Sequence, residues 1–494
     1  MQIPFGEWLP DQPEYLNPGA NTANNVYFAR QSYKRFPSLV AYSSNNIGAN
    51  SRGAGSFRDN SNNVFNFVAN NTDIFQLDGG TFTSRKSSLT GTNTDYFTFT
   101  QFGQFVVASN GKDAAQYYEM GTSTNFANLS TIGTSGTVPV FKVSGVVRDF
   151  FVTGNHTNNS NRIQWSGIND LTTWQPGTKQ SDLQDLPGSG GQITHITSGE
   201  IGYVFRQNQI IRMDYVGGAT VFRLSVISPN RGAVLGRTVC QDNRRVFFYA
   251  DDGFYELNGD QVISIGAEKV NRFFDTDLNK AFSDRICAAV DPFNQLALWL
   301  YPSASNTANT TGICDKVIIY NYATQKWSTA DASASTIFSQ FVGAYTVELM
   351  DIISENLDAI NIALDTDFWN GGQLYLGAID SDFKAAIFSG TENEGTLETR
   401  ELELFPGHRS SITNIRPIVD ATSTVTISSK ERLADTATES SSSSMVASGD
   451  NPVRQSGRYF KIKVTTPSGS VWTHAQGVDL IASRIGLRWQ KKLI

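Results

Sequence analysis

Bulky and polar residues alternate along most of this chain, in short runs separated by turn-forming residues. In Arg162–Trp165, β-branched and aromatic positions alternate with polar ones, which is typical of a strand. Ser166–Asp170 then supplies residues that hydrogen-bond their own backbone or accept a positive φ, and Trp174 follows as a second aromatic anchor. The pattern predicts one β-hairpin of a larger β structure.

Units of the same kind recur along the chain. The clearest lies within residues 246–265, where three short strands are separated by the turn sequences Asp251-Asp252-Gly253 and Asn258-Gly259-Asp260. The period is roughly 40 to 50 residues, which is the range of four-stranded propeller blades. We therefore predict an all-β fold, a β-propeller-like repeat of short antiparallel strands with about five to seven blades. A pair of β-sandwiches is the alternative, although a propeller hides more sheet edges.

Composition divides the chain into three regions. Residues 46–395 hold the repeats and are the predicted propeller body. Residues 396–494 are predicted to form a C-terminal β region that closes the propeller or builds a platform, with a mobile Ser-rich loop at 430–452. Residues 1–45 are predicted to be an extended N-terminal arm, because four prolines exclude a helix there: Pro4, Pro10, Pro13 and Pro18.

Three short segments depart from the hairpin pattern. Residues 275–283 and 354–360 are the two stretches that we expect to form short helices. Residues 482–489 alternate again and are expected to form a strand that closes the final sheet.

Composition also narrows the classes of function. The chain has 494 residues, of which 17% are charged, and a net charge of -7 with no basic block. This argues against a protein that grips nucleic acid by neutralising phosphates, but not against one that lets nucleic acid slide past. No stretch approaches the roughly 20 apolar residues of a membrane helix, and the N-terminus lacks the features of a secretion signal. We expect a soluble protein that is made in the cytosol.

Side chains that carry chemistry are scarce. The four histidines stand alone, and the motifs of serine hydrolases and nucleotide-binding proteins are missing, so we expect no catalytic residue, cofactor or metal. Asp251 and Asp252 with Glu256 could form a calcium loop or a carboxylate pair, but a hairpin turn between aromatic strands is favoured. We expect neither a disulfide nor a zinc framework from the three cysteines, Cys240, Cys287 and Cys314.

The hairpin Ser166–Trp174 resembles the Asp box of sialidase propellers, a turn built from Ser, Asp, Gly, Thr and Trp. Leu171 stands in place of the glycine, and the spacing differs by one residue. In sialidases the box is structural, so the resemblance implies a role in folding. Five residues are candidate anchors of blade hairpins: Trp165, Asp170, Trp174, Gly253 and Trp327.

A second resemblance begins at the N-terminus. Phe5–Pro13 and Tyr33–Leu39, which contains an Arg-Phe-Pro-Ser turn, resemble the start of tail nozzle or hub proteins of short-tailed bacteriophages, also called packaged-DNA stabilisation proteins. Ser51-Arg52-Gly53 and the Trp165–Trp174 hairpin also resemble segments of that family. In the family, an extended arm precedes a β-propeller.

The resemblance implies a structural virion protein of a podovirus tail, assembled in the host cytoplasm, with no enzymatic activity. It would form a ring of its own copies, by analogy a homohexamer, below the portal and adaptor proteins, and it would meet tail fibres or a needle. Packaged double-stranded DNA would be retained there and conducted through the lumen during ejection, without specific binding. The candidate subunit or adaptor interface is Trp8, Tyr15, Arg35 and Phe36.

Other interpretations stay open at this point. The protein could instead be a virion propeller that binds or cleaves glycans of the host surface, or a propeller scaffold unrelated to phages. The N-terminal arm could cross onto a neighbouring subunit, or it could only cap the first blade of its own chain.

Overall fold

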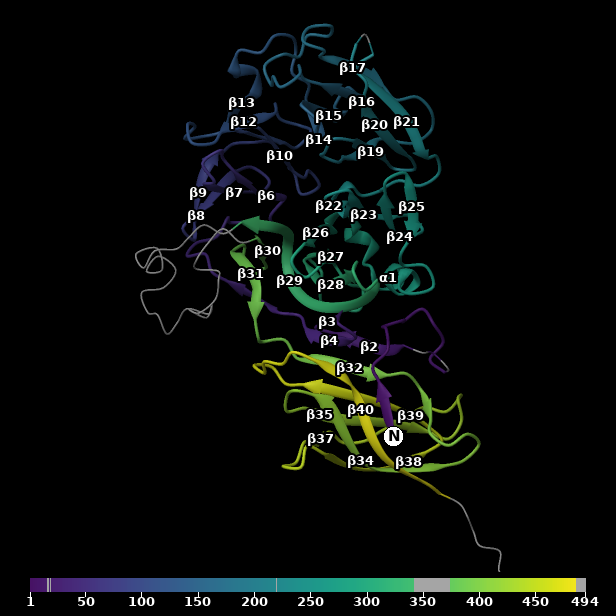
Figure 1. The fold of residues 1–494 in the computed structure, drawn as a ribbon. Helices are drawn as coiled ribbons and strands as arrows, with labels where there is room; N and C mark the ends of the chain where they lie inside the picture. Colours follow the sequence, from purple (N-terminus) through teal and green to yellow (C-terminus); the bar gives the residue numbers. More distant parts are fainter. Residues whose placement is uncertain (16, 18, 219, 342–373, 486–494) are drawn as a thin grey trace, which may run out of the picture.

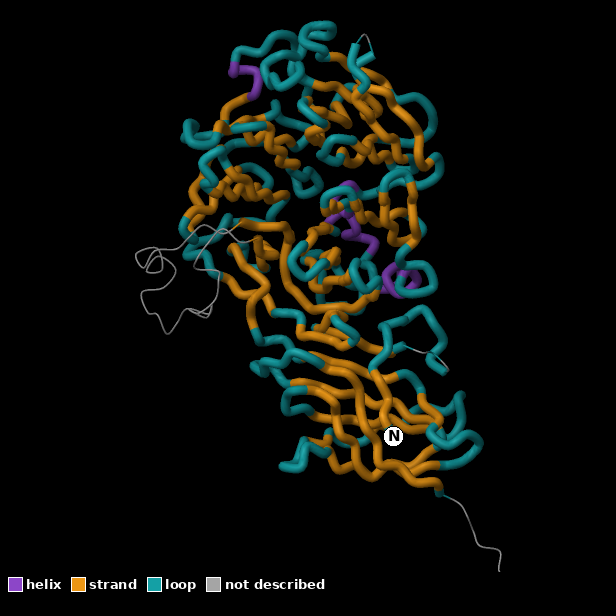
Figure 2. The backbone as a smooth tube through the Cα atoms, viewed as in Figure 1, coloured by secondary structure: helices purple, strands orange, loops and turns teal. Residues whose placement is uncertain are grey.

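The computed structural model describes residues 1–15, 17, 19–218, 220–341 and 374–485. These residues form a ring of small sheets, the upper body in Figure 1, and a β-sandwich below it. Figure 2 shows that both bodies consist of strands joined by loops, with helix in a few short segments. The described helices are short: η1 (Leu129–Ile132), η2 (Gly236–Thr238), α1 (Asn271–Asp277) and η3 (Lys280–Arg285).

The upper body is a β-propeller, as predicted. Its first five blades are separate four-stranded antiparallel sheets whose strands follow one another in the chain. Blade 1 consists of β6 (Gly53–Arg58), β7 (Val64–Ala69), β8 (Ile74–Asp78) and β9 (Thr81–Lys86). Blade 2 consists of β10 (Thr98–Phe102), β11 (Phe105–Ser109), β12 (Gln116–Glu119) and β13 (Ala127–Asn128). Blade 3 consists of β14 (Phe141–Val147), β15 (Phe150–His156), β16 (Asn159–Trp165) and β17 (Asp182–Asp185). Blade 4 consists of β18 (Ile193–Ile196), β19 (Gly202–Arg206), β20 (Ile210–Tyr215) and β21 (Phe222–Ser228). Blade 5 consists of β22 (Cys240–Asp242), β23 (Arg245–Ala250), β24 (Gly253–Asn258) and β25 (Gln261–Ser264).

One long strand, β29 (Lys326–Phe341), joins blades 6 and 7. Its first half pairs with β28 and completes blade 6, and its second half pairs with β30 and begins blade 7. β5, from the N-terminal region, pairs with β31 and supplies the fourth strand of blade 7. The remaining strands are β26 (Cys287–Asp291), β27 (Leu296–Tyr301), β28 (Cys314–Asn321), β30 (Leu374–Asp380), β31 (Ala385–Gly390) and β5 (Ser38–Ala41). The described residues therefore form seven blades, and a strand from the start of the chain closes the ring.

A separate hydrophobic cluster fills each junction between neighbouring blades, including the junction of blade 7 with blade 1. Because the series of clusters includes the junction of blade 7 with blade 1, the blades form a closed ring. An open row would leave the outer faces of its first and last blades without a partner. In order from the junction of blades 1 and 2, representative pairs are Phe67 and Val106, Val107 and Phe151, Trp165 and Phe222, Phe205 and Phe248, Phe254 and Trp299, Leu298 and Ile337, and Ile387 and Val68.

The lower body is a sandwich of two sheets assembled from both ends of the chain. The strands of one sheet are β1 (Gln2–Pro4), β3 (Val26–Ala29), β4 (Ser32–Arg35), β34 (Ser410–Val419), β38 (Asn451–Gly457) and β40 (Ala475–Arg484). Those of the other are β2 (Ala20–Asn24), β32 (Gly395–Thr399), β33 (Leu402–Glu403), β35 (Thr424–Lys430), β36 (Thr438–Glu439), β37 (Ser443–Ser444) and β39 (Tyr459–Thr466). β2 also forms a short parallel contact with β29, which links this sheet to the propeller.

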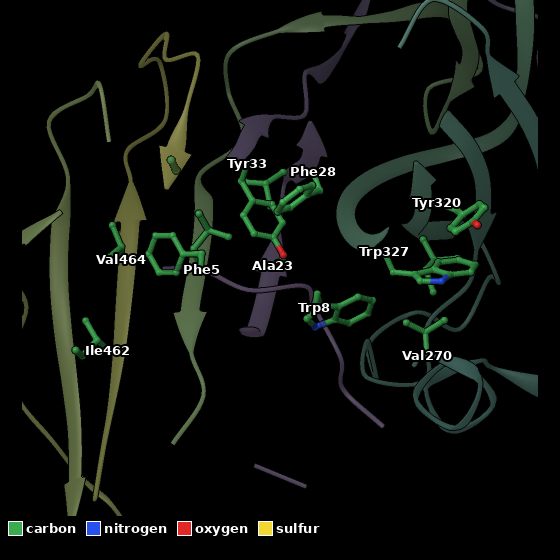
Figure 3. Packing of buried hydrophobic residues seen from close by; sticks show 14 of the residues in the cluster. Phe5, Trp8, Ala23, Phe28, Tyr33, Val270, Tyr320, Trp327, Ile462 and Val464 are labelled. Carbon is green, nitrogen blue, oxygen red and sulfur yellow. The ribbon is translucent and has the colours of Figure 1, made fainter. Parts of the chain in front are cut away.

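The N-terminal region lies between the two bodies (Figure 3). Phe5, Trp8 and Tyr33 belong to one hydrophobic cluster that runs from Trp327 in the propeller to Val464 in the sandwich. Within the expected arm, residues 1–45, the strands pair within their own chain. The sequence could not distinguish pairing within the chain from pairing with a neighbouring subunit, because an extended segment has the same local preferences whichever chain supplies its partner.

Other segments differ from the predictions in detail. The helix expected at 275–283 is α1 followed by the 3-10 helix η3, and the helix expected at 354–360 lies outside the described residues. The strand expected at 482–489 overlaps the end of β40 (Ala475–Arg484), and residues 486–489 lie outside the described residues. Within the Ser-rich stretch 430–452, β36 and β37 fold back onto β35.

Candidate functional site

The innermost strands of the seven blades surround a cavity on the propeller axis. Its volume is about 550 Å³, and its walls include β6, β10, β14, β18, β22, β26 and β29. Phe57 and Phe99 make part of the wall apolar, while Lys142 and Arg237 bring positive charge to it. The volume falls within the range of small-molecule sites.

Three arginines gather around Tyr96 beside this cavity. The guanidinium carbon of Arg237 lies 4.1 Å from the centre of the Tyr96 ring, and that of Arg52 lies 5.5 Å from it. Arg285 lines a small neighbouring hollow together with Arg52, Tyr96 and Arg237. The hydroxyl of Tyr96 donates a hydrogen bond to Asp284 Oδ2 at 3.0 Å. We call these five residues the arginine cluster.

The arginine cluster carries more positive than negative charge. Within the described residues, Arg52, Arg237 and Arg285 form no ion pair; they bond to neutral groups such as Asn71 Oδ1. Burial lowers the pKa of Arg52, Tyr96 raises it, and the charges of Arg285 and Arg237 lower it further. Burial also raises the pKa of Tyr96, so its hydroxyl keeps the proton that it donates to Asp284.

The cysteines and histidines offer little reactive chemistry. All three cysteines are free and buried, and burial raises the pKa of each thiol. Burial lowers the pKa of His156 and of His195 to about 4, so both rings are neutral at pH 7. In the part of the chain that the structure describes, no three His, Cys, Asp or Glu side chains gather in a way that could hold a metal ion. Glu256 is paired with Arg245 at 2.7 Å rather than with Asp251 or Asp252.

The candidate hairpin anchors of blade 3 lie in one polar turn. Asp170 accepts hydrogen bonds from the backbone N–H of Thr172 at 2.8 Å and from its hydroxyl at 2.6 Å, and it pairs with Lys179. Trp174 is fully buried and donates its indole N–H to the carbonyl oxygen of Leu171 at 2.8 Å. Trp165 is buried as well and bonds to the carbonyl oxygen of Gln180. These contacts stabilise the turn and leave neither indole face open to a ligand.

The candidate anchors Gly253 and Trp327 lie at the junction of blades 5 and 6. Gly253 has φ 134° in the hairpin between β23 and β24, and a Cβ there would lie 1.9 Å from Asn271 Nδ2, so a larger residue does not fit. Trp327 is fully buried and packs against Phe254, Trp299 and Tyr320 with ring centres 4.8 to 5.8 Å apart.

The four candidate interface residues contact their own chain. Trp8 and Phe36 are each 3% exposed; Trp8 packs edge-on against Phe273 and Phe36 packs against Phe388. Little of either side chain is left for a contact with another subunit or the adaptor, and their role at an interface stays a prediction. Tyr15 donates a hydrogen bond to Glu403 at 3.2 Å, and Arg35 donates one to the carbonyl oxygen of Ser470 at 3.3 Å. Tyr15 and Arg35 remain half-exposed, so their role at an interface stays a prediction.

Sequence reasoning missed the arginine cluster and an apolar hollow of about 510 Å³ between blades 6 and 7. Phe36 and Phe388 lie in the wall of this hollow, and Phe293, which is 87% exposed, stands at its rim. Asp291–Asn294 gives one local signal, since an aromatic residue in a hairpin turn is unusual. The arginines give none, because they are brought together from three separate segments of the chain, those that precede β6, β22 and β26.

Comparisons with known proteins show resemblance to solved propellers. No family model matches the chain, and no curated protein matches it. A chain of the Mitotic Checkpoint Complex aligns over 73% of this chain and 97% of its own, with 10% identity and a TM-score of 0.40. The WD40 domain of Neurospora crassa Pan2 aligns over 73% and 96%, with 7% identity and a TM-score of 0.37, and the WD40 repeats of RRP9 align over 62% and 88%, with 8% identity and a TM-score of 0.39. These values concern the fold alone and carry no argument about function.

None of the helices formed by the described residues has the length and apolar character needed to cross a membrane.

Proposed function

We propose that this chain is a structural subunit of the tail of a short-tailed bacteriophage, with no enzymatic activity. Copies of it form a closed ring, by analogy a hexamer, below the portal and adaptor proteins. The ring retains packaged double-stranded DNA and conducts it during ejection. Tail fibres or a needle attach to the same assembly.

The continuous core shared by the two bodies is the observation that carries this proposal. One hydrophobic cluster includes Trp299 and Trp327 of the propeller, Phe5 and Trp8 of the N-terminal region, and Val464 of the sandwich. A large apolar junction holds two bodies in a fixed orientation, whereas a small polar one lets them move. A wall that confines DNA under pressure needs such stiffness, and the segments Phe5–Pro13 and Tyr33–Leu39, which resemble nozzle proteins, supply it here.

The size of the axial cavity sets where DNA would pass. A volume of about 550 Å³ suits a small ligand and not a duplex, so the conduit in this proposal lies between subunits rather than through one propeller. A net charge of -7 on each copy gives the ring an acidic character, which disfavours binding of DNA phosphates to its wall as the DNA passes. The proposal therefore requires a ring of several copies.

The experiment that tests the proposal is electron cryomicroscopy of the particles that carry this chain, with no symmetry imposed on the tail. We expect a ring of copies coaxial with the portal and an open axial channel. Native mass spectrometry of the purified full chain gives an independent count of copies. Monomers in both solution and particle would overturn the proposal, and copies found only on peripheral appendages would favour the glycan-binding or glycan-cleaving alternative.

A further inference from the structure

We infer that the axial cavity of the propeller is a binding site for a small phosphate-bearing molecule, held against Arg237. This site is independent of the ring and would exist in a single copy of the chain. It lies where the innermost strands converge, and among the described residues that line it the cations Arg237 and Lys142 outnumber the one carboxylate, Asp284.

Charge is the first argument for this ligand class. Arg52, Arg237 and Arg285 contribute three positive charges around Tyr96, and Asp284 contributes one negative charge, which leaves an excess of two. A phosphate monoester carries about -1.5 to -2 charges at pH 7, so one such group would balance the cluster. Arg52 is 3% exposed, and a buried charge without a compensating charge is costly, so a bound dianion would reduce that cost.

Geometry then selects Arg237 as the residue that touches the ligand. Arg237 and Tyr96 line both the axial cavity and the small hollow behind it, whereas Arg52 and Arg285 line only the hollow. The hollow holds about 10 Å³, which is too small for more than a single water. The ligand must therefore lie in the axial cavity, with the charges of Arg52 and Arg285 acting on it from behind.

Arg237 is also held in position for this task. Its side chain donates to Thr336 Oγ1 at 3.2 Å and to the carbonyl oxygen of Arg285 at 3.4 Å, and it stacks on Tyr96. A guanidinium fixed in this way keeps further N–H donors for the planar two-point contact that phosphate accepts. Lys142, on the wall formed by β14, adds a second cation to the cavity. The remaining volume leaves room for an organic group on the phosphate.

The test uses the full chain with two probes, inorganic phosphate and ribose 5-phosphate, in isothermal titration calorimetry at constant ionic strength. We expect saturable binding of ribose 5-phosphate to one site per chain, and a loss of about 10- to 100-fold in affinity for Arg237→Gln. The matched control is Arg223→Gln, at a surface arginine whose side chain is 66% exposed and lies 3.6 Å from Asp214. This control should bind as the unmodified protein does.

A measurement on the unmodified protein guards against a variant that fails to fold. Arginine modification by phenylglyoxal, read by mass spectrometry, should slow at Arg237 when ribose 5-phosphate is present, and should not change at Arg223. The inference is overturned if neither probe binds saturably, if Arg237→Gln binds with unchanged affinity, or if Arg237 and Arg223 are protected equally. A failure here would leave the ring proposal untouched, because that proposal depends on the assembly and not on this cavity.

Discussion

At the scale of single residues, aromatic side chains pack between neighbouring sheets and stabilise their junctions. Trp327 packs on Phe254, Trp299 and Tyr320, and it donates its indole N–H to the carbonyl oxygen of Ile265 at 2.9 Å. Such a residue combines a large buried area with a satisfied polar group, which makes it hard to replace. The sequence singled out Trp327 as a candidate anchor of a blade hairpin, but the partners that make it important come from other strands.

Replacing this tryptophan should therefore be costly. Trp327→Ala is expected to lower the free energy of unfolding by about 3 to 5 kcal/mol, because it removes buried apolar area and leaves a cavity among three rings. Urea denaturation followed by fluorescence and circular dichroism measures the change. Phe293→Ala is the control, since Phe293 is 87% exposed and its loss should cost about 0.5 kcal/mol or less. Equal costs for the two variants would contradict this account.

A buried histidine makes stability depend on pH. Burial, with a smaller contribution from the positive charge of Arg162, lowers the pKa of His156 to about 4, and its ring lies 3.0 Å from the hydroxyl of Thr153. The unfolded chain has the ordinary value of about 6.5 and so takes up a proton first as pH falls. The stabilising effect of the neutral ring is thus complete above about pH 6.5 and declines as pH falls toward 4.

Nuclear magnetic resonance titration of the folded protein checks this pKa directly. The ring signals of His156, assigned by comparison with His156→Gln, should move near pH 4. Titration near pH 6.5 would show that the ring is accessible to water and that the packing described for blade 3 is wrong at this position.

At the scale of elements, local patterns predicted the strands better than their partners. The turn at Asp251–Gly253 was found because two-residue turns have a short-range signature, and β23 and β24 flank it as expected. β5 was not predicted as a closing strand, since its partner β31 lies hundreds of positions away in the chain. The same reason explains why Arg52 and Arg237 could not be predicted to meet.

The closure of the propeller ring by β5 can be tested by a substitution that buries one charged side chain in this strand. Val40 is 7% exposed and pairs with Ile387 of β31, within the cluster that joins blades 7 and 1. Val40→Asp should lower the free energy of unfolding by about 3 kcal/mol or more, because the carboxylate has no partner there. Hydrogen exchange should rise in β31 and β30 and stay unchanged in blade 3. Val446→Asp, at a position that is 47% exposed, is the matched control, and a uniform rise over all blades would contradict a local closure.

At the scale of the whole molecule, the two bodies should behave as one cooperative unit. Their cores are continuous through the N-terminal region, where Trp8 packs on Phe273 of the propeller helix α1 with the two ring centres 5.0 Å apart. Its indole N–H also donates a hydrogen bond to the carbonyl oxygen of Asn21 in β2, and β2 pairs with β32 of the sandwich. Melting of one body must therefore expose apolar surface of the other.

Differential scanning calorimetry of Trp8→Ala tests this coupling. We expect the unmodified chain to melt in one transition, and Trp8→Ala to melt in two, because the variant loses about 3 to 5 kcal/mol at the junction and little within either body. Val471→Ala, at a sandwich loop position that is 74% exposed, should keep the single transition. Two transitions in the unmodified chain would mean that the bodies are only loosely joined, and the stiffness on which the proposed role in a tail wall depends would then be missing.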